Sequence, residues 1–224
     1  MIPVETEDMK TPKQAALHSV KRLLAAKWPD ARKTSVHEVF HTGVSEFDAL
    51  FQGGGMPCGQ WIEITGGSAS GKTRFLFALL RGLTQNGYVT YFDFPHSLFP
   101  PAVTAAGVQE SRFWMVRPRN LREGIRTAEK LFATEGVCCV VFDLVGQKEK
   151  MPHVLAHRLR QETMRARTLI LFLTDAGSAV ISASTVALRL EVHRKSTHRL
   201  AIQVVRSRIS LAATRLLWRV PADA

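Results

Sequence analysis

A glycine-rich run in the first half of the chain has the residue types and spacing of a phosphate-binding loop. It matches the pattern G-x-x-x-x-G-K-[ST] and consists of Gly66, Gly67, Ser68, Ala69, Ser70, Gly71, Lys72 and Thr73. Glycines let the backbone close tightly, so that several amides point at one phosphate near the positive end of the following helix. Lys72 supplies a cation for the outer phosphates, and the Thr73 hydroxyl can ligate Mg²⁺. The run therefore predicts a site for a nucleoside triphosphate with Mg²⁺.

A second acid is needed to position the metal, and Asp143 is the candidate. It lies in residues 137–144, an unbroken apolar run typical of a strand that is buried on both faces. In α/β sheets ligands gather at the carboxyl ends of such strands, where the Asp143 carboxylate would meet an Mg²⁺ held by Thr73. The alternative is an aspartate that caps the next helix. We interpret the neighbouring Cys138 and Cys139 as small core residues rather than reactive thiols.

Strand-like and helix-like segments alternate around these residues. Strands are expected at 60–65, 88–93, 113–116, 137–144 and 168–174, and helices at about 72–84, 121–133 and 153–165. Such alternation is typical of a largely parallel sheet. Three more strand-like segments follow with short turns, at 185–193, 200–206 and 214–220. The expected fold class is therefore α/β, with a mostly parallel central sheet flanked by helices and with antiparallel C-terminal strands.

An amphipathic helix is expected ahead of this core. Thr11 and Pro12 have the preferences of a helix N-cap and first turn, and apolar residues then recur at helical spacing as far as Trp28. We therefore expect an N-terminal helix and linker over residues 1–37 and a nucleotide-binding core over residues 38–224. The apolar face of the helix could pack on its own core or on a neighbouring subunit or partner.

The chain is strongly basic. Its 224 residues hold 30 Lys and Arg against 19 Asp and Glu, a formal net charge of +11 at pH 7. Such a surplus favours a polyanionic partner, nucleic acid before anionic membrane. Between residues 192 and 220 there is no acid, and the bases are Arg194, Lys195, Arg199, Arg206, Arg208, Arg215 and Arg219. A one-signed stretch within a folded region usually serves binding, although a merely solvated basic surface is the alternative.

Composition excludes several classes of protein. Apolar residues at 46% and charged residues at 22% are ordinary globular usage, which excludes wholesale disorder. No apolar run approaches the roughly 20 residues of a membrane span, and the first residues lack the basic-then-apolar order of a signal peptide. The three cysteines cannot build a disulfide framework or a zinc site by themselves. We therefore expect a soluble, cytoplasmic protein that does not bind membranes.

Several segments resemble the core of the RecA-type recombinases. They are residues 42–59 ahead of the phosphate loop, residues 93–108 with the spacing His-x-Leu-x-Pro, and the late segments 184–191 and 204–209. The most specific is the first, which reads Thr-Gly…Asp…Gly-Gly-Gly-x-Pro-x-Gly. The resemblance covers roughly residues 38–220. It implies a RecA-like P-loop core that binds ATP and Mg²⁺.

The chain departs from this family at two positions next to the expected site. In the family, an acidic residue two places after the aspartate of the second strand activates water, but here Pro95 stands two places after Asp93. Proline has no proton-accepting side chain, and neither Asp93 nor His96 is obviously placed to replace it. We therefore expect ATP to be hydrolysed slowly, if at all. The family's switch glutamine corresponds to Asp175, whose charge would be unfavourable near the γ-phosphate unless Mg²⁺ intervenes, so nucleotide signalling is expected to differ or be absent.

Other family features are reduced or kept. The segments that bind DNA inside the recombinase filament shrink to residues 145–155 and 175–184, so we do not expect strand exchange by this chain alone. Arg206 and Arg208 correspond to paired basic residues that reach a neighbouring subunit's ATP. Because alternate strand residues share a face, both could contact one phosphate chain. The alternative is a solvated or DNA-facing strand edge.

The chain is most similar to the RecA-related accessory proteins of bacterial mutagenesis cassettes, the ImuA group. The similarity lies in its small size, the absence of the family's base and its short loops. This resemblance implies an ATP-binding protein of the DNA-damage response. It would act with DNA, single-stranded DNA above all, with a RecA recombinase filament and with error-prone polymerases in translesion synthesis; self-association is compatible with this role. Two alternatives stay open. One is an active DNA-dependent ATPase or recombinase, and the other is a RecA-fold regulator, such as a division inhibitor, that does not bind nucleic acid.

Overall fold

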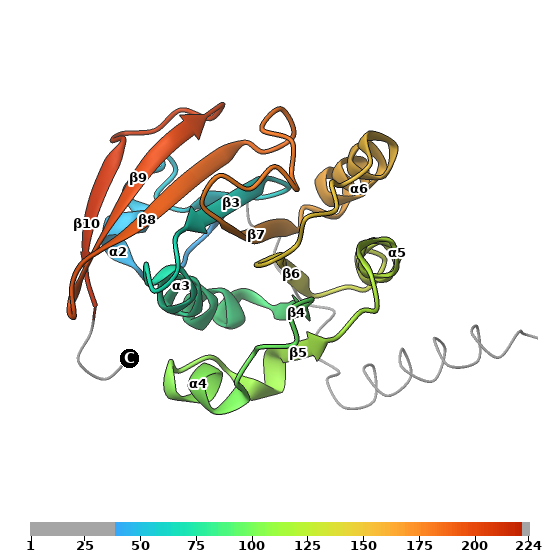
Figure 1. Cartoon of the computed structure of the whole chain (residues 1–224), viewed down its shortest axis with the longest axis horizontal. Helices are drawn as coiled ribbons and strands as arrows, with labels where there is room; N and C mark the ends of the chain where they lie inside the picture. Colours follow the sequence, from blue (N-terminus) through green and yellow to red (C-terminus); the bar gives the residue numbers. More distant parts are fainter. Residues whose placement is uncertain (1–38, 221–224) are drawn as a thin grey trace, which may run out of the picture. The chain divides into compact units, whose positions relative to one another are not determined.

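A central sheet runs through residues 39–220, the part of the chain that this computed structural model describes. Its strands are β3 (Trp61–Gly66), β4 (Tyr88–Asp93), β5 (Phe113–Val116), β6 (Val137–Asp143), β7 (Leu169–Asp175), β8 (Leu188–Ser196), β9 (Arg199–Ser207) and β10 (Arg215–Arg219). Their order across the sheet is β10-β9-β8-β3-β7-β6-β4-β5 (Figure 1). The six strands from β8 to β5 are parallel, while β9 and β10 are antiparallel to their neighbours. β3 therefore lies inside the sheet, between β8 and β7.

Helices cover both faces of the sheet. On one face lie α3 (Lys72–Asn86) and α4 (Pro100–Ala105), and on the other lie α5 (Leu121–Leu131) and α6 (His153–Ala166) (Figure 1). Along α3 the buried apolar residues recur at helical spacing from Phe75 to Leu83, and they pack in one core with the β3 residues. This packing fixes the amino end of α3 at the carboxyl end of β3.

The central strands are almost fully buried. All seven residues of β6 are buried, and so are the first six of β7. Aromatic rings connect the strands under α5 and α6: the Phe142 ring centroid lies 5.0 Å from Phe92 and 5.6 Å from Phe172, and Trp61 lies 5.1 Å from Phe172. Ring pairs at these distances stabilise a core beyond the area they bury. The strand ends that face the candidate site are therefore held on a rigid frame.

A turn ahead of β3 packs closely on α3. It follows β1 (Val39–Phe40), which pairs with β2 (Met56–Pro57), and it leads into the short helix α2 (Ser45–Asp48). The Asp48 carboxylate accepts hydrogen bonds from the amide and the hydroxyl of Thr42, at 3.0 and 2.8 Å. A Cβ at Gly82 would lie 1.8 Å from the Thr42 carbonyl oxygen, so only glycine allows this approach. The Thr-Gly…Asp stretch therefore anchors the first turn of the core to α3.

The expected fold class is confirmed, with local differences. The first of the three C-terminal strands, β8, pairs in parallel with β3, so the antiparallel part of the sheet begins only at β9. The helices α2 and α4 were not expected; α4 starts with Pro100 and Pro101, which suit a first helical turn. The helix expected within residues 1–37 lies outside the described residues. Within residues 39–220, no helix has the length and apolar character needed to cross a membrane.

Candidate nucleotide-binding site

The glycine-rich run forms the turn between β3 and α3. Gly71 has a φ of +88°, in the left-handed region that favours glycine. A Cβ at Gly71 would lie 2.7 Å from Leu200 Cδ2, and a Cβ at Gly66 would lie 2.8 Å from the Val192 carbonyl oxygen. The β8–β9 hairpin thus packs directly against the turn. It helps to hold the turn at the amino end of α3, where free backbone amides favour an anion.

Lys72 is held at the turn by two oxygen atoms. Its Nζ donates a hydrogen bond to the Gly66 carbonyl oxygen at 2.8 Å and forms an ion pair with Asp175 Oδ1, also at 2.8 Å. The second carboxylate oxygen, Asp175 Oδ2, accepts a hydrogen bond from the Gly146 amide at 2.8 Å. Partial burial opposes ionisation of Asp175, but the bonds from Lys72 and Gly146 outweigh it and lower the pKa of this carboxyl. Asp175 is therefore a carboxylate at neutral pH.

Asp143 ends β6 and is buried beside the candidate site. Its Oδ2 accepts a hydrogen bond from the Tyr91 hydroxyl at 2.6 Å, and its Oδ1 accepts one from the Val145 amide at 3.2 Å. Burial raises the pKa of Asp143, although both hydrogen bonds act in the opposite direction. Tyr91 is a partner that sequence reasoning missed, because the contact joins two strands that lie side by side only in the folded sheet. Thr73, the other expected metal ligand, is exposed on the first turn of α3.

Tyr91→Phe is expected to destabilise the protein by about 1–3 kcal/mol, because it leaves a buried carboxylate oxygen of Asp143 without its donor. Chemical unfolding of the two proteins measures this difference. Tyr88→Phe is the matched control, since it removes a hydroxyl from the same strand without touching Asp143. Equal unfolding free energies for wild type and Tyr91→Phe would contradict the expected role.

The turn contains one buried polar atom that fits a phosphate. Ser70 Oγ is buried and has no hydrogen-bond partner among the described residues. Buried hydroxyls are nearly always paired, and a phosphate oxygen that enters the turn would accept this hydrogen bond. Thr73 and Asp143 offer the oxygen ligands that Mg²⁺ prefers. Within residues 39–220, no cluster of three or more His, Cys, Asp or Glu side chains could hold a metal ion.

The segment after β4 has no carboxylate available for water activation. The Asp93 side chain is fully buried and accepts hydrogen bonds from the amides of Ser97 and Leu98 and from Arg117 Nε, at 2.9, 3.2 and 3.0 Å. Asp93 therefore fixes the backbone of the segment that follows β4. Pro95 stands two residues later, and His96 is exposed with a φ of +55°.

Arg206 and Arg208 are not brought to this turn. Both are exposed at the end of β9, where the Arg208 amide bonds to the Ala187 carbonyl oxygen and the Ala187 amide bonds to the Trp61 carbonyl oxygen, each at 2.8 Å. They are thus level with the start of β3, whereas the glycine-rich turn follows its end. Contact with a phosphate in this chain's own turn is excluded by that placement.

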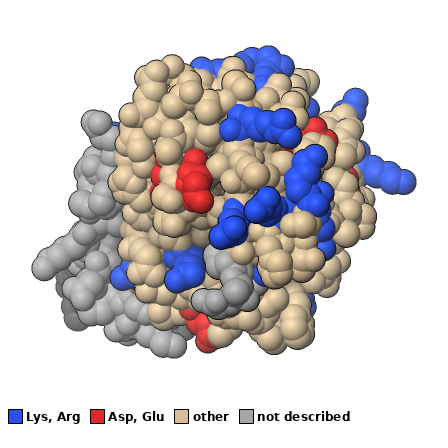
Figure 2. Space-filling model, turned by 90° about the vertical axis from the view of Figure 1, so that its left-hand side faces the viewer, with Lys and Arg blue, Asp and Glu red and all other residues tan. Residues whose placement is uncertain are grey.

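The three C-terminal strands carry a concentrated positive charge. We call β8, β9 and β10 with their turns the basic strands, and all seven of the bases between residues 192 and 220 are exposed there. Figure 2 shows Lys and Arg gathered on this side of the molecule, with few acidic side chains among them. Arg199 and Arg219 stand directly opposite each other in the β9–β10 register. Like charges in such pairs repel, so a bound anion would relieve the repulsion.

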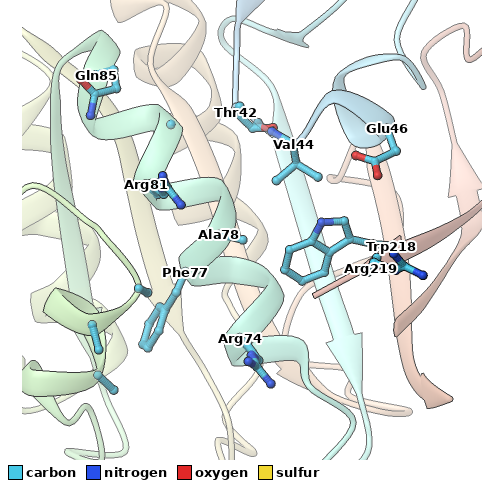
Figure 3. A pocket seen from close by; sticks show the side chains of 15 residues that line it. Thr42, Val44, Glu46, Arg74, Phe77, Ala78, Arg81, Gln85, Trp218 and Arg219 are labelled. Atoms are coloured by element: carbon cyan, nitrogen blue, oxygen red, sulfur yellow. The ribbon is translucent and has the colours of Figure 1, made fainter. Parts of the chain in front are cut away.

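A separate hollow of about 810 Å³ lies beside α3. The arginines that line it extend the positive charge of the basic strands onto this helix. The floor of the hollow is apolar and includes Phe77 and Ala78, and Arg81 and Arg219 are exposed at its rim. Figure 3 shows Arg74 and Arg81 on α3 on one side, with Trp218 and Arg219 on the other. Trp218 itself is 4% exposed, as expected for a core tryptophan. The hollow lies on the outer side of α3 and does not include the glycine-rich turn.

Comparison with known proteins agrees with this architecture. The sequence profile of the RecA N-terminal domain matches residues 18–169, more than half of the chain. The protein ImuA of Caulobacter vibrioides (strain NA1000 / CB15N) is 33% identical over 110 residues, which is 46% of this chain and 45% of ImuA. The RecA protein of Borreliella burgdorferi (strain ZS7) is 34% identical over 150 residues, 62% of this chain and 40% of that protein.

A third relative is the RecA protein of Prochlorococcus marinus (strain AS9601), 27% identical over 172 residues, which is 73% of this chain and 47% of that protein. The chain thus spans less than half the length of these relatives. The match with the RecA domain, the parallel sheet and the glycine-rich turn between β3 and α3 agree with one another. The chain therefore belongs to the RecA family, and within it resembles ImuA at modest identity.

Proposed function

We propose that this protein is a nucleotide-binding accessory factor of the DNA-damage response, which acts with single-stranded DNA, a recombinase filament and error-prone polymerases in translesion synthesis. The observation that carries the proposal is the glycine-rich turn of a RecA-type core, with Lys72 and an unpartnered Ser70 hydroxyl at its centre. Similarity to ImuA and RecA supports the setting in DNA damage. We assign nucleotide binding to the core over residues 38–224.

The residues of the turn have distinct roles in this proposal. The amides of residues 66–73 and the Ser70 hydroxyl bind phosphate oxygens, and Lys72 neutralises the outer phosphates. Thr73 and Asp143 hold Mg²⁺, with Tyr91 and Val145 orienting the Asp143 carboxylate. A nucleotide held by these residues would distinguish the loaded state of the protein from the empty one. Because Pro95 stands in place of a base, nucleotide hydrolysis is slow, and the protein acts mainly through nucleotide binding.

The basic strands are the proposed contact with single-stranded DNA. Phosphate contacts make such binding strongly dependent on salt, because each neutralised phosphate releases counterions. The Arg199–Arg219 pair lies at the end of β9 that is close to Arg194 and Lys195, and as a pair of like charges it gains most from a bound phosphate. Arg206 and Arg208, at the far end of β9, face either DNA or the ATP of an adjacent subunit in a filament.

The free cysteines suit a reducing compartment, which agrees with the cytoplasm.

DNA binding is tested by fluorescence anisotropy of a labelled single-stranded oligonucleotide at several salt concentrations. The double variant Arg199→Ala/Arg219→Ala is expected to weaken binding and to reduce the salt slope by about 1 for each DNA phosphate that is no longer neutralised. Arg122→Ala/Arg126→Ala removes the same charge from exposed residues of α5, outside the basic strands, and should have a smaller effect. Absence of salt-dependent binding by wild type, or equal reductions in affinity in both variants, would argue against this role of the basic strands.

The partner proteins are tested by affinity purification from cells with and without DNA damage. Wild type is expected to recover a recombinase or a polymerase after damage. The Arg206→Ala/Arg208→Ala variant should recover less recombinase if these residues reach across a subunit boundary. Recovery of neither partner by wild type would count against a role in translesion synthesis.

A further inference from the structure

We propose that Asp175 makes this site select nucleoside diphosphates over nucleoside triphosphates. This role rests on the nucleotide site proposed above and adds the residue that sets its preference. Asp175 ends β7 and pairs in register with Gly66, the first residue of the glycine-rich turn. The Thr65 hydroxyl donates a hydrogen bond to the Asp175 carbonyl oxygen at 2.8 Å. The backbone of Asp175 is therefore fixed beside the turn.

The Asp175 carboxylate is fixed as well. Oδ1 contacts Lys72 Nζ and Oδ2 accepts the Gly146 amide, each at 2.8 Å, so rotation of the side chain would break both contacts. Nearly half of the side chain, 45%, is nevertheless exposed. Asp175 thus places a fixed, partly exposed negative charge directly beside the Lys72 ammonium.

This charge lies where the outer phosphates of a nucleotide would go. The lysine of a phosphate loop binds the β- and γ-phosphates, and here the same ammonium already has a carboxylate oxygen at 2.8 Å. A γ-phosphate that reaches Lys72 must displace Asp175 or remain within a few ångströms of it. A diphosphate brings one charged group fewer to this place. At an effective dielectric constant of about 20, like charges this close lower affinity by more than about tenfold.

The selectivity is measured by titrating ADP and ATP, each with Mg²⁺, into wild type, Asp175→Asn and Glu149→Gln by calorimetry. Wild type is expected to bind ADP at least about tenfold more tightly than ATP. Asp175→Asn should tighten ATP binding by about tenfold or more while changing ADP binding much less. Glu149 is exposed in the segment after β6, and its replacement removes the same charge without altering either affinity.

Two results would overturn the inference. One is a wild-type protein that binds ATP as tightly as ADP, which decides the question even if Asp175→Asn does not fold. The other is an unchanged ratio of the two affinities in a folded Asp175→Asn protein, as judged by its thermal unfolding. If wild type and Asp175→Asn bind neither nucleotide, the proposed nucleotide site itself is wrong, and the selectivity assigned to Asp175 is wrong as well.

Discussion

Replacement of Glu63 by alanine is expected to lower the free energy of unfolding by about 3–5 kcal/mol. Glu63 lies in the middle of β3, and its side chain is 1% exposed. Its Oε2 forms an ion pair with Arg189 Nε at 2.6 Å, and its Oε1 accepts a hydrogen bond from the Thr174 hydroxyl at 2.9 Å. Alanine would leave the largely buried Arg189 guanidinium and the buried Thr174 hydroxyl without the carboxylate that both contact. A buried charge without its partner is strongly destabilising.

The Glu63 contacts also connect the three strands that surround the candidate site. Arg189 belongs to β8 and Thr174 to β7, and β8 leads into the hairpin that packs against Gly66 and Gly71. Loss of Glu63 is therefore expected to loosen that hairpin as well as the sheet.

Chemical unfolding of Glu63→Ala and of a surface control measures the effect. Glu162→Ala removes an exposed ion pair with Arg165 within α6, and such pairs contribute less than about 1 kcal/mol. A Glu63→Ala protein no less stable than Glu162→Ala would contradict the importance given to the buried pair.

Pro95→Glu is expected to raise ATP turnover by about a hundredfold, the lower end of what general-base assistance supplies. Pro95 follows β4 at the carboxyl edge of the sheet, the same edge as Asp143 and the glycine-rich turn. The nearby Asp93 is committed to backbone amides and Arg117, so it does not supply the missing base. A carboxylate at position 95 would restore a proton acceptor where the RecA-type recombinases have one.

Steady-state phosphate release compares Pro95→Glu with Pro95→Gln, which has nearly the same shape but no basic carboxylate. Only the glutamate variant should gain activity, and Lys72→Ala in that background should abolish the gain. Wild-type turnover equal to that of Pro95→Glu would show that Pro95 does not limit hydrolysis.

The parts of the site that follow one another in the chain could be predicted from the sequence. The glycine-rich turn and the placement of Asp143 at a strand end depend on local patterns, on glycine conformation and on the alternation of strands and helices. The overall α/β class follows from the same patterns. The strand ends agree with expectation to within about three residues, and the largest difference is at β8, expected at 185–193 and found at Leu188–Ser196.

The contacts that hold the charged side chains of the site in place could not be predicted from the sequence. The Lys72–Asp175 ion pair joins residues 103 positions apart, and the Tyr91–Asp143 hydrogen bond joins residues 52 apart. Both depend on which strands are neighbours in the sheet, and periodicity does not contain that information. The parallel pairing of β8 with β3 escaped prediction for the same reason: a short turn-linked strand pattern suggested antiparallel neighbours, but the long connection before β8 returns the chain to the same direction.

Binding of adenine nucleotide with Mg²⁺ to wild type and to Lys72→Ala, measured by calorimetry, tests the central claim most directly. We predict saturable binding of one ADP or ATP per wild-type chain and a loss of affinity of at least about a hundredfold in Lys72→Ala, which removes the cation that faces the outer phosphates. A wild-type protein that binds neither nucleotide, or a Lys72→Ala protein that binds them equally well, would contradict the assignment of the glycine-rich turn as a nucleotide site.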